Sequence, residues 1–267
     1  MKKIDVLTYC TCYPYEIFER FIGSLNDTGF GGNIWIIIRT NQDKEHLDRL
    51  SKTHSNIKAI IDTSRPTIHI NAHRFIVYKF VLEKIQMACD YLLICDSRDV
   101  LFQKNFEEYP YDPNIDIYGF LELKTINDEP AFNKPWIQQI EYFTKESVLK
   151  YVGDNKIICC GTTIGKIVAL KKYVNYMCNM FEKYNIKHNL DQGIHNYMLY
   201  MNKLNVNVKL LSNKDNLVNT TCQDVKKIND DNLIVNEDND VSYIVHQYDR
   251  FPIELKKKIS SKYDFVS

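Results

Sequence analysis

The chain has 267 residues, of which 45% are hydrophobic and 25% charged, a composition that excludes a disordered or collagen-like polypeptide. Its 34 basic and 34 acidic side chains cancel, which excludes an overall electrostatic attraction to nucleic acid or to an anionic membrane surface. A chain of this length can bury one full α/β core, so we expect a single domain whose function lies in a local site.

Apolar strand candidates alternate with helical patterns through the first half of the chain. Short apolar runs predict strands at residues 4–7, 34–38, 57–61 and 91–95. Apolar residues at helical spacing predict helices after Pro14, within the polar segment 41–54, and over 72–87. Such alternation implies parallel strands joined by right-handed crossovers, a Rossmann-like α/β layout that binds ligands at the carboxyl ends of its strands.

The second half of the chain has a more mixed pattern. Apolar runs predict strands at residues 115–121, 157–159, 206–211 and 242–245, and helical spacing predicts helices over 170–184 and 190–201. The region around Trp136 is polar and has no predicted element. The Asn- and Asp-rich segment 223–240 predicts a surface loop with at most one short strand.

The sequence carries no targeting or membrane-spanning pattern. Asp5 interrupts the first apolar run, so the long apolar core of a secretory leader is missing, and no apolar run is long enough to span a bilayer. The eight cysteines form no C-x-x-C pair, and Cys89 and Cys95 suit small, reduced core residues. These features predict a cytoplasmic protein without a transmembrane segment.

The most informative segment is Asp96-Ser97-Arg98-Asp99, because it places two carboxylates at the end of a strand too apolar to be exposed. Buried carboxylates are costly unless a cation compensates them. A hard divalent ion binds carboxylate oxygens together with substrate phosphates, which suits this arrangement. The alternative is that Asp96 caps a turn while Arg98 and Asp99 form a local ion pair, and for a bare D-x-x-D this alternative is the better one.

This segment resembles the D-x-D motif of GT-A glycosyltransferases, which follows an apolar strand and precedes a short apolar run such as Val100-Leu101-Phe102. In that family the motif binds the metal that bridges the nucleotide diphosphate, which implies Mn²⁺ or Mg²⁺ as cofactor. Here D-x-D becomes D-x-x-D, with Ser97 in place of an acid. The resemblance implies that Asp99 is a metal ligand and that Asp96 and Ser97 bind the donor, with direct metal ligation by Asp96 left open.

The resemblance covers most of the chain and implies the Rossmann-like GT-A fold, with a mostly parallel central sheet flanked by helices in a single domain over residues 1–267. Residues 1–103 would form the nucleotide-binding half, and residues 104–267 the donor-sugar and acceptor half. Thr8 and Tyr9 close the first strand, where the similar fold seats the nucleotide base, although Tyr9 fits a core position equally well.

Two further segments support the resemblance. Arg74 lies in an N-x-x-R-F element before the acidic strand, where it would hold the donor diphosphate or pair with Asp96, although a lone arginine is as often a solvated surface residue. Gly161 and Thr162 belong to a small-residue segment that resembles the loop on which such enzymes lay the donor sugar. That segment is no P-loop, because its glycines are one residue too close and Ile167 replaces the metal-binding hydroxyl.

The C-terminal part supplies a carboxylate and an imidazole. Asp191 and Gln192 open a helix and resemble the family's D-Q element, which implies that Gln192 binds the donor and that Asp191 acts as a general base or steadies a cationic sugar carbon. The ordinary alternative for Asp191 is a favourable charge at a helix N-terminus. His195 shares that helix face and is better explained as structural. His246 ends an apolar strand, where the resemblance implies a second metal ligand.

These residues predict a divalent-metal-dependent glycosyltransferase that moves a sugar from a nucleotide diphosphate sugar, with a UDP-sugar favoured, to a glycan or other acceptor hydroxyl. A sugar-phosphate nucleotidyltransferase is an alternative, but it needs a glycine-rich basic loop after the first strand, and residues 10–14 contain no glycine. A protein that binds a nucleotide sugar or glycan without turnover is the other alternative, and the sequence leaves it open. No nucleic-acid partner is expected.

Overall fold

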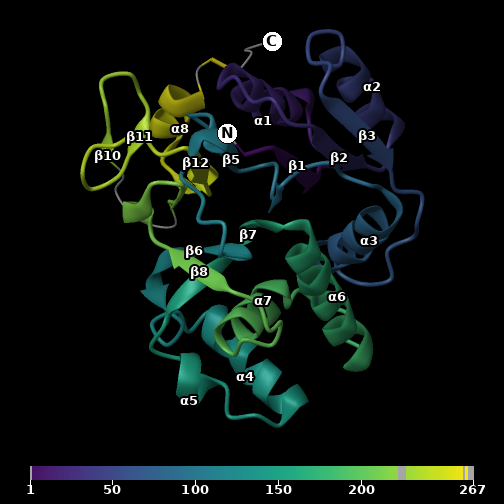
Figure 1. Ribbon diagram of the computed structural model, residues 1–267, viewed down its shortest axis with the longest axis vertical. Helices are drawn as coiled ribbons and strands as arrows, with labels where there is room; N and C mark the ends of the chain where they lie inside the picture. The colour runs from purple at the N-terminus through teal and green to yellow at the C-terminus, as the bar shows by residue number, and fades with distance from the viewer. Residues whose placement is uncertain (1, 222–226, 261, 264–267) are drawn as a thin grey trace.

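The centre of the computed structural model is a seven-stranded sheet with the strand order β3-β2-β1-β4-β7-β6-β8 (Figure 1). The structure describes residues 2–221, 227–260 and 262–263. The strands of this sheet are β1 (Ile4–Tyr9), β2 (Ile34–Ile38), β3 (Ile57–Ile61), β4 (Tyr91–Cys95), β6 (Ile117–Thr125), β7 (Lys156–Lys166) and β8 (Val208–Leu211). The α-helices are α1 (Tyr15–Asp27), α2 (Asn41–Leu50), α3 (Ile70–Lys84), α4 (Asn133–Thr144), α5 (Leu149–Val152), α6 (Ile167–Lys183), α7 (Asp191–Tyr200) and α8 (Ile253–Ser260).

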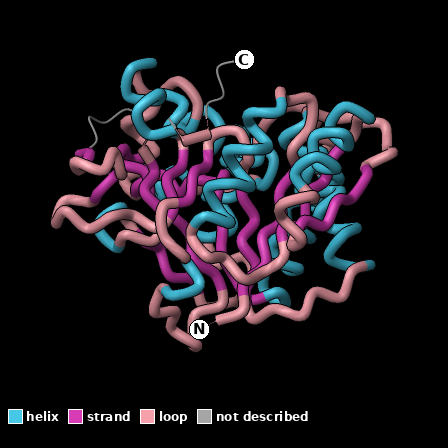
Figure 2. Tube along the Cα trace, turned by 90° about the horizontal axis from the view of Figure 1, so that it is seen from above, coloured by secondary structure: helices cyan, strands magenta, loops and turns pink. Residues whose placement is uncertain are grey.

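Most neighbouring strands of the central sheet run parallel. β1 pairs in parallel with β2 and β4, β2 with β3, and β6 with β8. β7 runs antiparallel to both of its neighbours, β4 and β6. The strands form a middle layer with helices on both sides (Figure 2). The predicted architecture, a mostly parallel central sheet flanked by helices in a single domain, is therefore confirmed.

The central sheet separates two hydrophobic layers, because alternate residues of a strand point to opposite faces. In β1, Leu7 packs into the layer that contains α3, α6 and α7, whereas Val6 packs into the layer that contains α1. Ile37 and Ile36 divide in the same way in β2. Burying such a side chain fully contributes about 1.5–3 kcal/mol. Burial on both faces explains why these strands are continuous apolar runs.

A smaller sheet brings the C-terminal part of the chain to the end of β4. It has the order β5-β12-β9, with β5 at Val100–Phe102, β12 at Ile244–His246 and β9 at Val218–Thr220. β12 runs antiparallel to β5, and His246 pairs with Val100. Because Val100 directly follows Asp99, this pairing carries His246 to the acidic segment.

The structure corrects three local predictions. The Cys160–Gly165 segment lies inside β7 rather than in a loop, because its residues from Thr162 onward pair with β4. The polar region around Trp136 forms α4, whose apolar side is buried. The Asn- and Asp-rich segment contains two short strands, β10 (Lys227–Ile228) and β11 (Ile234–Val235), which pair antiparallel. Residues 223–226 of that segment lie outside the described residues.

Candidate active site

Two neighbouring cavities open beside the carboxyl ends of β1 and β4. One, of about 400 Å³, is called the β1 cavity and is lined by Tyr9, Thr11, Cys12, Tyr13, Arg39, Ile70 and Ser97. The other, of about 560 Å³, is called the central cavity and is lined by β6, β7, α4 and α7. The two cavities share Asn71, Arg74, Asp96, Arg98 and Asp99. Ligands of open α/β sheets bind at this end of the strands, so a single extended ligand can occupy both cavities.

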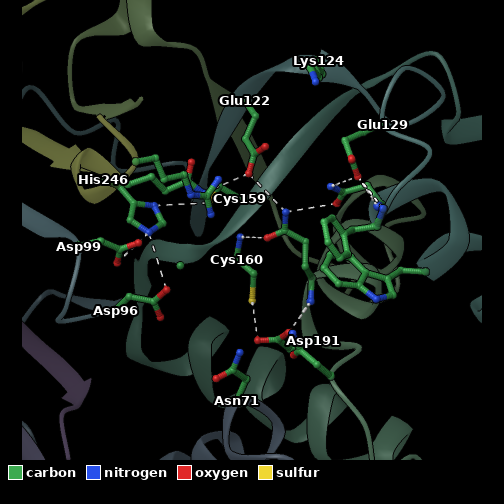
Figure 3. Close-up of a pocket in the computed structure, with 18 of the residues that line it drawn as sticks. Asn71, Asp96, Asp99, Glu122, Lys124, Glu129, Cys159, Cys160, Asp191 and His246 are labelled. Atoms are coloured by element: carbon green, nitrogen blue, oxygen red, sulfur yellow. Dashed lines mark hydrogen bonds and ion pairs between the residues drawn. The ribbon is translucent and has the colours of Figure 1, made fainter. Parts of the chain in front are cut away.

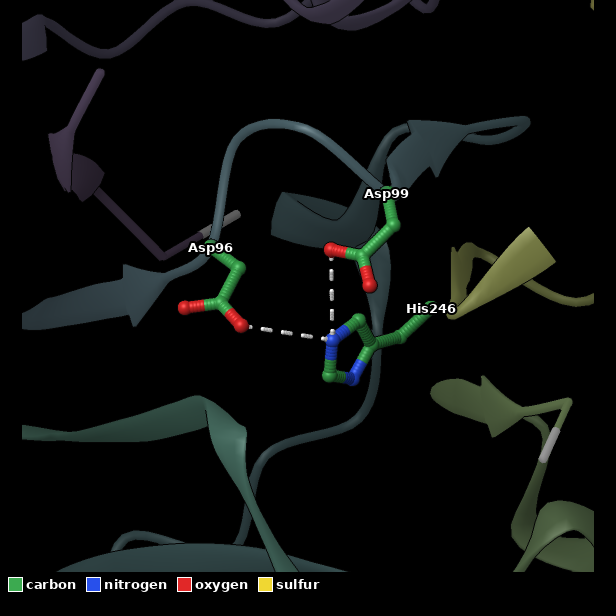
Figure 4. A group of neighbouring side chains, drawn as sticks. All are labelled: Asp96, Asp99 and His246. Carbon is green, nitrogen blue, oxygen red and sulfur yellow. Dashed lines mark ion pairs between the residues drawn. The ribbon is translucent and has the colours of Figure 1, made fainter. Parts of the chain in front are cut away.

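Asp96, Asp99 and His246 come together in space (Figure 4). Asp96 and Asp99 line both cavities, and His246 lines the central cavity. One ligand atom of each lies within 4.8 Å of the other two. His246 Nε2 is 3.7 Å from Asp96 Oδ2 and 3.7 Å from Asp99 Oδ1. Asp99 and His246 are only 5% and 1% exposed. Two carboxylates and one imidazole at this spacing fit a divalent cation that keeps positions open for a ligand.

The charges around this group respond to burial in different ways. Burial resists ionisation of Asp96, but Arg74 and His246 outweigh that effect and lower the pKa of Asp96. Burial raises the pKa of Asp99 against the opposing charge of His246, and Asp96 adds to the rise. Burial alone would lower the pKa of His246, yet Asp99 and Asp96 raise it. Two carboxylates therefore crowd one buried imidazole, and additional positive charge is favourable here.

Gly161 in β7 leaves the space in which these three side chains meet. A Cβ atom at this position would lie 2.3 Å from His246 Cε1, 2.6 Å from His246 Nε2 and 2.7 Å from Asp96 Oδ2. No side chain larger than hydrogen fits without displacing one of those groups. The sequence singled out Gly161 for approach to a sugar, and the structure shows that it also makes room for the Asp-Asp-His group.

Arg74 connects this group to Asp191. Its Nη1 donates to Asp96 Oδ1, and its Nη2 donates to Asp191 Oδ2 at 2.9 Å. The Arg74 side chain is 13% exposed, so two carboxylates from β4 and α7 share one buried cation. Burial raises the pKa of Asp191, against the opposing charge of Arg74. The hypothesis that Arg74 orients Asp96 agrees with this geometry, whereas a solvated surface arginine does not.

Gln192 is held by a network of polar groups in the central cavity. Figure 3 shows how Glu122, Cys160 and Asp191 lie around this cavity. Its Oε1 accepts from the Cys160 backbone N–H at 2.9 Å, and its Nε2 donates to Glu122 Oε1 at 3.3 Å and to Asn133 Oδ1 at 3.2 Å. Gln247 Nε2 lies 3.5 Å from the same Glu122 oxygen. Each polar atom of the Gln192 amide therefore has a partner, which fixes the amide beside Asp191.

The second ring nitrogen of His246 rests on a thiol. His246 Nδ1 is 3.4 Å from Cys159 Sγ, which also accepts from Gln247 Nε2 at 3.4 Å. Burial raises the pKa of Cys159 well above its ordinary value, so the group is a neutral thiol at physiological pH. A partner on Nδ1 fixes the ring orientation and leaves Nε2 directed at the two carboxylates.

The other predicted donor-binding residues separate into two groups. Tyr9 and Ser97 line the β1 cavity, and the Tyr9 hydroxyl donates to Asp62 at 2.7 Å. Thr8 and Thr162 are fully buried in the sheet and line neither cavity. The Thr8 hydroxyl donates to a backbone carbonyl of β4 at 2.8 Å. His195 is also buried and bonds to Tyr173 rather than facing a cavity.

Sequence patterns did not single out several side chains of this site. Glu122 lies at the end of the apolar part of β6. A carboxylate within an apolar strand is unusual, and this signal could have identified Glu122 from the sequence. Cys159 looks like an ordinary core residue in sequence. Arg98 lines both cavities, and its bond to Asp249 at 2.9 Å is closer than its local pair with Asp99 at 3.8 Å. The alternative of a purely local Arg98–Asp99 pair therefore does not describe the segment.

No protein-family model and no curated protein matches this chain. Solved structures do match it over nearly its full length. Mouse xyloside xylosyltransferase 1 superimposes on 94% of this chain and 99% of its own, with a TM-score of 0.57 and 13% identity. The galactosyltransferase LgtC, solved with donor and acceptor sugar analogues, superimposes on 98% and 97%, with a TM-score of 0.58 and 12% identity.

A third similar structure is the glycosyltransferase GlyE of Streptococcus pneumoniae TIGR4. It covers 100% of this chain and 61% of its own length, with a TM-score of 0.55 and 13% identity. All three structures are of glycosyltransferases, and at this identity the likeness is one of fold. The GT-A fold predicted from the sequence is confirmed.

Proposed function

We propose that this GT-A chain is a glycosyltransferase that moves a sugar from a nucleotide diphosphate sugar to an acceptor hydroxyl, with Mn²⁺ or Mg²⁺ held by Asp96, Asp99 and His246. One observation carries the proposal: two carboxylates that follow β4 converge with an imidazole from β12, about 150 residues later in the chain, beside the two cavities. A structural role for buried acids does not explain why Asp96 and Asp99 line both cavities, why His246 lines the central one, and why Gly161 leaves space between them.

The donor is proposed to lie across both cavities, with the nucleoside in the β1 cavity and the sugar in the central cavity. All residues that line the β1 cavity come from the first hundred residues, which supports the division into a nucleotide-binding half (1–103) and a sugar and acceptor half (104–267). The diphosphate then lies at the shared wall, where Arg98 supplies a partly exposed guanidinium. Tyr9 and Tyr13 offer aromatic rings to the base, and a UDP-sugar is the favoured donor.

Asp96, Asp99 and His246 would hold the divalent ion, which would supply positive charge to the diphosphate leaving group, so no acid would be needed there. Arg74 holds Asp96 toward the ion site and Asp191 toward the central cavity. Asp191 is proposed to face the reacting sugar carbon, where it accepts the proton of the acceptor hydroxyl or steadies positive charge at that carbon. Gln192, with its amide fixed, is proposed to bind the donor sugar.

The acceptor is proposed to be a glycan or another hydroxyl compound that enters at the rim of the central cavity. Phe132, which is 59% exposed, and Trp136 lie there with ring centroids 5.7 Å apart, and aromatic faces of this kind suit a sugar ring. Among the described helices, none has both the length and the apolarity to cross a membrane. A cytoplasmic location stays a prediction, which cell fractionation tests.

The proposal is tested with a panel of nucleotide sugars, by following donor turnover with and without Mn²⁺. Wild type should hydrolyse at least one donor in a metal-dependent way, and Asp99→Ala should lose that activity. Asp48→Ala is a matched control, because Asp48 is an exposed residue that pairs with Lys44 and lines neither cavity. Binding of a nucleotide sugar without turnover under any condition would instead support the non-catalytic alternative. Release of pyrophosphate from a nucleoside triphosphate would support the nucleotidyltransferase.

A further inference from the structure

Beside Asp191 lies a chain of three buried polar side chains, here called the hydrogen-bond chain: Cys160, Tyr173 and His195. Cys160 Sγ is 3.9 Å from Asp191 Oδ2 and 3.8 Å from the Tyr173 hydroxyl. The Tyr173 hydroxyl is 2.8 Å from His195 Nδ1. These residues come from β7, α6 and α7, and all are at most 6% exposed. Because the core around them is apolar, their hydrogen atoms have few possible acceptors.

The protonation states decide which residue donates to which in the hydrogen-bond chain. Burial and the charge of Arg74 lower the pKa of His195 to about 3, so its ring is neutral and carries one N–H. His195 Nε2 is buried and has no hydrogen-bond partner among the described residues. A hydrogen on Nε2 would be a buried donor without an acceptor, which is rarer than an unused acceptor. The hydrogen therefore belongs on Nδ1, where it points at the Tyr173 oxygen.

The remaining bonds follow from this tautomer. The Tyr173 oxygen accepts from His195, so its own hydrogen is available to Cys160 Sγ, and the Cys160 hydrogen points to Asp191 Oδ2. Burial raises the pKa of both Tyr173 and Cys160, so both keep these hydrogens at physiological pH. Three hydrogen bonds thus run one after another toward the Asp191 carboxylate, and aligned hydrogen bonds of this kind strengthen one another.

Asp191 needs these hydrogen bonds because its other neighbours have opposing effects on the ionisation of its carboxyl group. Burial disfavours its charge, and Asp96 repels it. Arg74 attracts it, but Arg74 is shared with Asp96, and the backbone N–H of Gln192 donates to the other oxygen, Oδ1, at 3.0 Å. In the part of the chain that the structure describes, these groups and Cys160 are the ones that act on the carboxylate by charge or by hydrogen bond. The hydrogen-bond chain stabilises the ionised carboxylate without adding net charge, and the Asp-Asp-His group does not share it.

We propose that Tyr173 and His195, acting through Cys160, are positioning residues that hold the Asp191 carboxylate ionised and oriented toward the central cavity. The proposal rests on the proposed function, because it assigns these residues a role in sugar transfer through Asp191. It distinguishes Cys160 from a simple core residue, since an alanine or valine would fill the strand but would end the chain of donors.

The decisive variant is Tyr173→Phe. The Tyr173 ring packs edge-on against Phe75 and His195, with centroids 6.1 and 5.6 Å apart, and phenylalanine keeps this packing while it removes only the hydroxyl. Tyr118→Phe is the matched control, because Tyr118 is also fully buried and its hydroxyl bonds to the Asp112 backbone instead. Thermal melting of both variants shows whether either loses its fold.

The readout is the pH dependence of kcat/KM for transfer by the Mn²⁺-loaded enzyme. Removing the Tyr173 hydroxyl leaves the Cys160 thiol in place but weakens its hydrogen bond to the ionised carboxylate, which raises the pKa of Asp191. The acid limb in Tyr173→Phe should therefore move to higher pH by about 0.1–0.7 unit. The donor KM should stay within about twofold, because the Tyr173 hydroxyl lines neither cavity. Cys160→Ser, which keeps a donor, should lie closer to wild type than Cys160→Ala.

A second readout needs no turnover. The Asp191 carboxyl carbon, followed by NMR as the pH changes, should titrate at a higher midpoint in Tyr173→Phe and at the wild-type midpoint in Tyr118→Phe. If neither the midpoint nor the acid limb moves in Tyr173→Phe, the proposed role of the hydrogen-bond chain is refuted and the proposed function still stands. A wild-type protein that turns over no sugar nucleotide overturns the proposed function itself, whatever the NMR midpoint.

Discussion

Replacing Gly161 with alanine should weaken metal binding while leaving the rest of the fold intact. The added methyl group would lie 2.3 Å from His246 Cε1 and 2.7 Å from Asp96 Oδ2, which is about 1.2 Å and about 0.8 Å inside an ordinary contact distance of about 3.5 Å. Asp96 is tied to Arg74, and the buried His246 ring lies against Cys159. Relief therefore requires a ligand to leave the position at which it faces the other two.

The expected effect is large on metal binding and small on stability. Disturbing the groups that orient a metal ligand typically costs about 10–100-fold in affinity, and direct displacement should cost at least that. Overpacking costs about 1–3 kcal/mol, but alanine recovers about 0.5–1 kcal/mol of the entropy that glycine loses in a strand. The net change in the free energy of unfolding should be about 0–2.5 kcal/mol, so the variant should remain folded.

Calorimetric titration of Mn²⁺ in the presence of UDP measures the affinity, and thermal melting measures the stability. Gly31→Ala is the matched control, because a Cβ there meets only Glu107 Oε2 at an ordinary 3.5 Å. Wild type and Gly31→Ala should bind Mn²⁺ alike, and Gly161→Ala should bind it at least about tenfold more weakly. Wild-type affinity in a folded Gly161→Ala protein would refute the steric argument and the position of the ion.

Two further predictions concern buried charges. Arg74→Ala should lower the free energy of unfolding by about 3–5 kcal/mol in chemical denaturation, because it removes the cation that Asp96 and Asp191 share. Arg74→Lys should recover only part of that loss, and equal stability of Arg74→Ala and wild type would contradict this reasoning. Burial opposes ionisation of Asp62, but hydrogen bonds led by that of the Ser64 hydroxyl lower its pKa below 3.8. Its ionised form therefore stabilises the fold above that pH, and the stability advantage of wild type over Asp62→Asn should shrink as the pH falls from about 6 to about 3. An advantage that is constant with pH is the opposing result.

Much of the fold could be predicted from short windows of sequence. The continuous apolar runs 34–38 and 91–95 predict strands buried on both faces, and both lie in the central sheet. Helical spacing after Pro14 predicts α1. The prediction failed where pairing overrides local preference: glycines 161 and 165 favour a loop in sequence, yet β7 runs through both because β4 and β6 pair with it.

The candidate site was predictable in its residue types but not in its arrangement. An acidic segment after a buried strand and a histidine at a strand end are visible in sequence, and the structure brings Asp96, Asp99 and His246 together. Glu122 and Cys159 were missed, since a single carboxylate or thiol in an apolar run has no partner until the chain folds. Glu122 meets Gln192 of α7, and Cys159 meets His246 of β12, and both partners are far away in sequence.

The sequence by itself determined the local elements, the buried acidic strand end and the resemblance to GT-A glycosyltransferases, because periodicity and short motifs are properties of neighbouring residues. Only the tertiary structure decided which side chains meet. β12 lies between β5 and β9, and the register that pairs His246 with Val100 directs an imidazole at two carboxylates. That register depends on the hydrogen bonds and packing of three distant segments at once, which no short window of sequence contains.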